Sequence, residues 1–232
     1  NINTGLRYDQ FQFEYVDFLQ TNYERQSQSK GILTPKVSLF YDFNQNLQVY
    51  GKAGIGFHSN DARVVVAQSG REILPKAFGT DLGILWKPTK NLLVNMGVWR
   101  LDLEQEFVYV GDAGVVEPSG ETERYGLDVS LRYQLNDWLY LDTDVNLTEA
   151  KSVGEPEGAN YIPLAPLLTS IGGLTVQHPS GFNGSLRYRY MGDRPANEDY
   201  SVTAEGYVIL DAVVKYTHSR FEVGISVENL LD

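Results

Sequence analysis

Four polar side chains lie close together where a long alternating segment gives way to a loop. They are His58, Asn60, Asp61 and Arg63. Binding residues are frequent in loops that a rigid scaffold positions, so we expect this run to contact a polar ligand or to shape the mouth of a lumen. The alternative interpretation is an ordinary solvated beginning of a loop.

Two arginines, Arg187 and Arg189, alternate with residues of apolar character and are expected on the polar face of a strand, as are Arg132 and Arg124. The guanidinium fork matches carboxylate and phosphate groups, so these side chains can attract an anionic ligand. Four aspartates should share that face, namely Asp128, Asp142, Asp144 and Asp211. We therefore favour the alternative, a structural network in which the charges of a water-lined interior pair with one another.

Covalent chemistry and metal binding find little support. Cysteine is absent, which excludes disulfides and thiolate sites. The three histidines are scattered without metal-ligand spacing, and no Gly-x-Ser-x-Gly motif occurs. Acidic residues in the loops match no calcium-binding loop, and only a non-local Ser–His–Asp arrangement remains open. We predict no catalytic residues, no metal site and no cofactor.

Charge and hydropathy narrow the class further. The net charge of −11 disfavours nucleic acid, which requires a basic face. No run of about 18 apolar residues is present, so no transmembrane helix is expected. The first residues have neither the charged nor the apolar region of a signal peptide. We expect the chain to be a trimmed protein or a fragment.

The elements that must position these residues are long β-strands. Over 125–135, apolar residues alternate with polar ones for about a dozen residues, whereas strands of soluble proteins average about 5–6. The same period of two recurs over 36–43, 47–58, 139–148, 182–191, 208–217 and 221–228, and it is blurred over 91–107 and 162–177. The alternation predicts an all-β fold with one apolar and one polar face, in a single region, 1–232.

The spacing of the turns predicts how the strands are connected. Short polar turns are expected near 44–46, 88–90, 136–137, 179–181 and 217–220, and longer connections near 17–31, 59–75, 111–121, 151–161 and 193–205. Aromatic residues such as Trp86, Trp138 and Tyr216 bracket the apolar face, as in the girdles of lipid-facing strands. This layout is typical of an antiparallel transmembrane β-barrel with about eleven long strands in this chain. Because an open edge cannot sit in hydrocarbon, the barrel must close.

Several segments resemble the β-barrel of TonB-dependent outer-membrane receptors. They cover 5–9, 34–39, 46–63, 131–139 and 223–232, and the last of them ends in the run Asn229-Leu230-Leu231-Asp232. The family has a barrel of twenty-two strands, an N-terminal plug domain and a TonB box. The plug, the box and the final strand are not found in this sequence, so the chain resembles roughly strands eleven to twenty-one.

The resemblance implies a receptor in the bacterial outer membrane that imports a scarce ligand, with a ferric siderophore as the expected one, and that is not an enzyme. The implied partners are the TonB complex, reached through the missing plug, the ligand, and the lipid and lipopolysaccharide of the outer membrane, but no nucleic acid. The alternatives are an outer-membrane barrel enzyme, a porin-like channel or a soluble all-β binding module.

Overall fold

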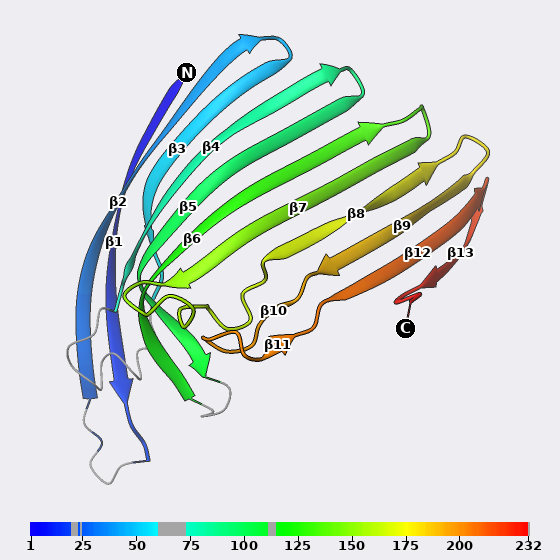
Figure 1. Cartoon of the computed structure of the whole chain (residues 1–232). Helices are drawn as coiled ribbons and strands as arrows, with labels where there is room; N and C mark the ends of the chain where they lie inside the picture. Colours follow the sequence, from blue (N-terminus) through cyan, green and yellow to red (C-terminus); the bar gives the residue numbers. More distant parts are fainter. Residues whose placement is uncertain (20–22, 24, 60–72, 111–114, 232) are drawn as a thin grey trace.

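The structure, a computed structural model, describes residues 1–19, 23, 25–59, 73–110 and 115–231, with the backbone alone for 107–110 and 115–119. The described residues form β-strands and no helix (Figure 1). The strands are β1 (Ile2–Val16), β2 (Arg25–Asn44), β3 (Leu47–Phe57), β4 (Lys76–Thr89), β5 (Leu92–Val110), β6 (Val115–Gln134), β7 (Leu139–Ser152), β8 (Leu168–Gln177), β9 (Phe182–Met191), β10 (Arg194–Pro195), β11 (Thr203–Ala204), β12 (Tyr207–His218) and β13 (Phe221–Val227).

Eleven strands make one antiparallel sheet, in the order β1-β2-β3-β4-β5-β6-β7-β8-β9-β12-β13. The short turns gather at one end of this curved sheet, at the upper right of Figure 1, and the described connections from β7 to β8 and from β9 to β12 lie at the other end. Strands β1 and β13 form the two edges, so the described sheet is an open part of a barrel wall. The prediction of an antiparallel barrel with about eleven long strands is confirmed.

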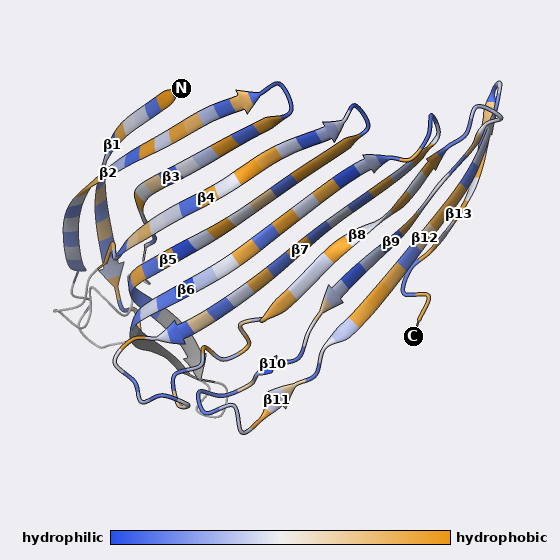
Figure 2. Ribbon diagram, turned by 45° about the horizontal axis from the view of Figure 1, so that its top comes forward, coloured by the Kyte–Doolittle hydropathy of each residue, from blue (hydrophilic) through white to orange (hydrophobic). Residues whose placement is uncertain are grey.

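Hydrophobic and hydrophilic residues alternate along the strands (Figure 2), so the two faces of the sheet differ as predicted. On one face, Leu82, Val98, Leu127 and Leu147 are neighbours in register on β4 to β7. We call this the outer face. Its apolar side chains are exposed, for example Leu82 at 59% and Val98 at 52%. A continuous exposed apolar surface of this kind suits contact with lipid rather than water.

The opposite, inner face is hollowed and polar. One hollow of about 430 Å³ is lined by residues from five consecutive strands, from Phe40 on β2 to Arg132 on β6. The hydroxyl of Tyr50 on β3 reaches Asn95 on β5 at 3.4 Å, across the intervening strand. Tyr50 reaches across because its neighbour on the intervening strand is Gly83, and the polar, hollowed character of this face assigns it to the lumen side of the wall.

Two expectations about the connections were wrong. β2 begins at Arg25 and β6 at Val115, so much of 17–31 and 111–121 is strand rather than loop. These strand ends continue past the apolar band, where neither face requires apolar side chains, and the period of two is therefore lost. The small β10–β11 hairpin within the connection from β9 to β12 was also not predicted.

The inner face uses glycine to seat large aromatic rings. Trp99 on β5 lies directly opposite Gly126 on β6, and a Cβ atom added at Gly126 would lie 2.1 Å from the Trp99 ring. The ring therefore occupies the space that a side chain at position 126 would take. In the same way Tyr50 covers Gly83.

We expect Gly126→Ile to destabilise the full-length protein by about 1–3 kcal/mol, because overpacking displaces the Trp99 ring. Combining it with Trp99→Ala should recover part of this loss, since the clash is with a side chain and not with backbone. Urea unfolding in lipid bilayers of Gly126→Ile, of Trp99→Ala and of the double variant measures the cost of the isoleucine with and without the Trp99 ring. Equal destabilisation with and without the Trp99 ring would contradict this account of the pair.

Candidate functional site

His58 lies immediately after β3, at the end of the sheet that carries the long connections. Its backbone N–H donates to the carbonyl of Pro75 at 3.4 Å, and the residue is half-buried. A small apolar cluster nearby, Ile32, Ile73 and Leu74 with Phe57 packed against it, fixes this strand end. The other three residues of the predicted run, Asn60, Asp61 and Arg63, lie outside the described residues.

Arg187 and Arg189 belong to β9, and strands β4 to β8 separate them from β3. The two groups of predicted ligand contacts are therefore not neighbours in the sheet. In a closed barrel they belong to different sectors of the wall, and contact with one ligand would have to occur across the lumen. Their role as ligand contacts stays a prediction.

Both arginines take part in ion pairs on the inner face. The pairs link β6 with β7, β7 with β9 and β9 with β12: Arg132–Asp144 at 2.8 Å, Arg187–Asp142, and Arg189–Asp211 at 2.9 Å. We call these six residues the inner-face network. It matches the structural alternative that the sequence favoured. Each guanidinium already has a carboxylate partner, so the network is close to neutral in charge.

Asp128 and Arg124, which the sequence predicted to join these ion pairs, have partners outside the inner-face network. The Asn146 amide donates to Asp128. Arg124 pairs with Glu106 at 2.7 Å and donates to both of its carboxylate oxygens. Glu106 is the register partner of Gly120, and a register shift between Leu103 and Glu106 turns it to the face that carries Arg124, which period-two reasoning does not reveal.

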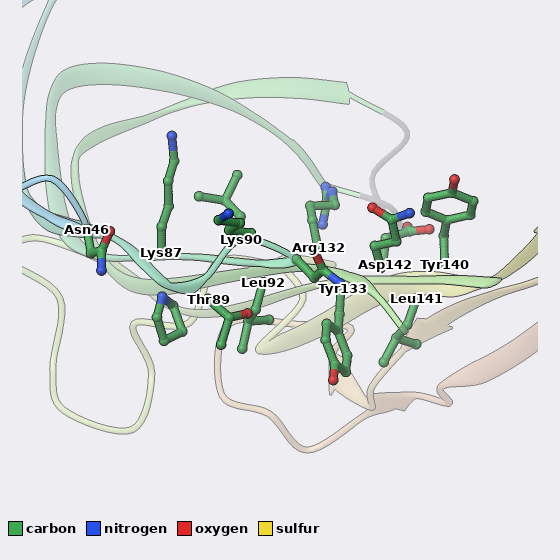
Figure 3. A pocket seen from close by; sticks show the side chains of 14 residues that line it. Asn46, Lys87, Thr89, Lys90, Leu92, Arg132, Tyr133, Tyr140, Leu141 and Asp142 are labelled. Atoms are coloured by element: carbon green, nitrogen blue, oxygen red, sulfur yellow. The ribbon is translucent and has the colours of Figure 1, made fainter. Parts of the chain in front are cut away.

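A second set of cations lies near the short turns (Figure 3). A hollow of about 900 Å³ is lined there by the β4–β5 turn and by parts of β6 and β7. In Figure 3, Lys87, Lys90 and Arg132 project from the same side of the ribbons, and Leu141 projects from the other. Sequence reasoning missed Lys87 and Lys90, although two lysines at and next to one predicted short turn were a visible signal.

The described loops at the opposite end are held together by specific contacts. Tyr161 and Tyr200 stack edge to face at 5.3 Å, and the Leu164 N–H donates to the Pro195 carbonyl at 2.7 Å. A hydrogen bond from the Ser201 backbone N–H lowers the pKa of the Asp199 carboxyl, which therefore stays charged into acidic solution. These loops form a defined rim at this end of the sheet.

Chemistry other than binding has little basis in the described part of the chain. No cluster of three or more potential metal ligands occurs there. His178 Nδ1 lies 2.7 Å from the Ser180 hydroxyl, but the Ser180 backbone N–H also donates to this nitrogen, within the same turn. The contact therefore stabilises a turn between neighbouring residues, and no acidic partner that would orient the histidine is seen with it.

Among the described residues, no helix is both long enough and apolar enough to cross a membrane.

Comparison with known proteins identifies the fold and the family. A family model described as "TonB dependent receptor-like, beta-barrel" matches residues 1–230. No curated protein sequence matches the chain.

Solved structures provide several similar barrels. The ferric citrate transporter FecA superimposes with a TM-score of 0.82 at 17% identity, over 100% of this chain and 38% of that one. The ferric-catecholate import receptor Fiu of E. coli K12 gives a TM-score of 0.77 at 19% identity, over 100% and 38%. The copper transporter OprC gives 0.77 at 14% identity, over 99% and 38%.

At these identities the structural likeness establishes the fold, and the chain spans a little over a third of each of these proteins. The family follows from the sequence model, because the match extends over nearly every residue. This chain belongs to the TonB-dependent receptor family and forms part of the β-barrel of a bacterial outer-membrane protein.

Proposed function

We propose that the full-length protein imports a ferric siderophore by transport that the TonB complex energises through a plug domain outside this chain. The observation that carries the proposal is the family match over residues 1–230. Two structural neighbours are described as a ferric-catecholate import receptor and a ferric citrate transporter, which favours chelated iron as the ligand. Another is a copper transporter, so copper is the competing cargo.

The proposed ligand contacts are His58, Asn60, Asp61 and Arg63 at the loop end of β3, and Arg187 and Arg189 on β9. His58 is supported by its position at a fixed strand end beside a long connection. For Arg187 and Arg189 the support is weaker, because their carboxylate partners compete with any anionic ligand. Because an aspartate already neutralises each guanidinium, the attraction of these two arginines for an anionic ligand is reduced.

The rival functions differ in what they require. Membership of an outer-membrane family excludes the soluble binding module. A barrel enzyme would need a nucleophile, a base and an orienting group in one place, and the described residues do not bring such a set together. A porin-like channel would pass solutes without TonB, and transport measurements therefore separate it from a receptor.

We expect uptake of at least one labelled ferric siderophore by cells that carry the full-length protein and lack other iron receptors. Uptake should fall to the level of receptor-free cells when TonB is deleted or the proton gradient is collapsed, because active import requires the energised inner membrane. In the same assay, Arg63→Ala should raise the siderophore concentration that gives half-maximal uptake, because this variant lacks one of the proposed ligand contacts.

Three outcomes would contradict the proposal. Uptake that persists without TonB would indicate a channel. Uptake of copper but of no ferric siderophore would reassign the cargo. A folded protein that transports neither would remove the import function proposed for this barrel.

A further inference from the structure

The hollow of about 900 Å³ near the short turns lies on the inner face of the sheet (Figure 3). Leu93 on β5, Arg132 on β6 and Asp142 on β7 line it, and they are register neighbours. Lys87 and Lys90, at the β4–β5 turn, line it as well. The short turns of outer-membrane barrels face the periplasm, so this hollow lies at the periplasmic mouth of the lumen. We call it the periplasmic hollow.

The periplasmic hollow continues along the wall into the smaller hollow of about 430 Å³, because Leu93 and Arg132 line both. The smaller hollow reaches Tyr50 and Lys52 on β3, and the Lys52 ammonium lies 4.5 Å from the centre of the Tyr50 ring. Asp81 lies opposite Lys52 in the register and partly balances its charge. A polar path therefore runs down the inner wall, and its excess of positive charge lies at the periplasmic end.

The charges of the periplasmic hollow do not cancel. The hollow is lined by three cations, Lys87, Lys90 and Arg132, and by one carboxylate, that of Asp142. The inner-face network already neutralises Arg132 and Asp142. In the part of the chain that the structure describes, neither lysine has a carboxylate within ion-pair distance. The hollow therefore keeps the positive charges of both lysines, whose side chains are exposed.

Two ammonium groups in one hollow favour a small anion. An ammonium binds carboxylate and phosphate oxygens as a point charge, and a cleft lined by charges of one sign raises the local concentration of ligands of the opposite sign. The volume of the hollow falls within the range of about 300–1,000 Å³ that is usual for small-molecule sites. In Figure 3, Tyr133 and Leu141 project from the opposite side of the ribbons, so the two lysines face the lumen and not the lipid.

We propose that the periplasmic hollow is an anion-binding site that holds the imported ligand on the exit side of the lumen through its carboxylate groups. The proposal rests on the import function proposed above and adds two points to it. The ligand passes this sector of the wall on its way to the periplasm, and it carries a net negative charge, as a carboxylate-bearing iron chelate does. The proposed contacts at the loop end of β3 would bind the ligand on arrival, whereas Lys87 and Lys90 would bind it before release.

The site itself is tested on the purified full-length protein in detergent, with citrate as the probe anion. Acylation of each lysine by an N-hydroxysuccinimide ester, followed by mass spectrometry, measures how accessible its ammonium is. When citrate reaches about three times its dissociation constant, about three quarters of the sites are filled, so Lys87 and Lys90 should react about fourfold more slowly than in chloride of equal ionic strength. Lys215 is the matched control. It lies on the inner face near another short turn but pairs with Glu222 at 3.1 Å, and its rate should not change.

The role in import is tested with the double variant Lys87→Gln and Lys90→Gln, which removes both charges from exposed side chains and leaves polar ones of similar shape. In cells, binding of a labelled ferric siderophore at the surface should be unchanged. Its uptake should fall about tenfold, which is the lower end of the effect of charge on association rates. Lys215→Gln should leave both binding and uptake unchanged.

Two results would overturn the site whatever the protein imports. One is equal acylation of Lys87 and Lys90 with and without citrate. The other is that both lysines are unreactive before citrate is added, because another part of the full-length protein would then fill the hollow. Uptake by the double variant at the unaltered rate would remove the role in import. Absence of any siderophore uptake would instead contradict the proposed function, and protection by citrate would still establish the anion site.

Discussion

Replacing Met96 with arginine is expected to destabilise the folded barrel by about 2–4 kcal/mol, the cost of a cation on the lipid face near the bilayer midplane. Met96 lies on the outer face of β5, between Ile84 and Val129 on the neighbouring strands. Its side chain is exposed, so the arginine would meet hydrocarbon and not a protein partner. Urea unfolding of the full-length protein in lipid bilayers, followed by tryptophan fluorescence, measures the change.

The adjacent residue provides the control. Asn95→Arg introduces the same side chain one position earlier on β5, where it points to the inner face between Leu85 and Ser130. A wetted lumen can solvate the guanidinium, so we expect a change within about 1 kcal/mol. Similar losses from both substitutions would show that the outer face does not contact lipid, and the assignment of the two faces would then be wrong.

The sequence predicted the strands well wherever one face must be apolar. Alternation is a local property, and in β6 it follows directly from the order of residues such as Leu127, Asp128 and Val129. The short turns were equally readable, because Asn, Pro, Gly and Ser favour turns through their own backbone and side-chain geometry. These local signals were enough to establish the order and number of the long strands.

Pairing across strands could not be read in the same way. Glu106 meets Arg124 only because the register between β5 and β6 shifts near position 106, and nothing in either segment specifies that shift. The order of the strands separates His58, at the end of β3, from Arg187 on β9, but it does not show which side chains on β9 meet which partners on β7 and β12. The sequence therefore predicted which residue types the candidate site contains, but not how they are arranged. The arrangement depends on pairing between strands that are far apart in the sequence.

The pair formed by Arg124 and Glu106 should be the most sensitive of the inner-face ion pairs. Its side chains are only 17% and 26% exposed, and the hydroxyl of the buried Thr122 also donates to Glu106 at 2.9 Å. Glu106→Leu would remove the carboxylate from a shielded guanidinium, which would keep its bond to the Thr122 hydroxyl oxygen, and would leave that buried hydroxyl without its carboxylate acceptor. We expect a loss of about 2–3 kcal/mol, somewhat below the cost of breaking a fully buried pair.

Removing both charges with Glu106→Leu and Arg124→Leu should recover at least about 1 kcal/mol relative to Glu106→Leu alone, because no unpaired charge then remains. The same substitution at an exposed pair is the control. Glu222→Leu breaks the contact with Lys215, where the side chains are 50% and 48% exposed, and it should change stability by less than about 1 kcal/mol. Urea unfolding of the full-length variants compares them directly. Equal losses at the two sites would mean that water reaches Arg124 as freely as Lys215, and the shielding argued from the structure would fail.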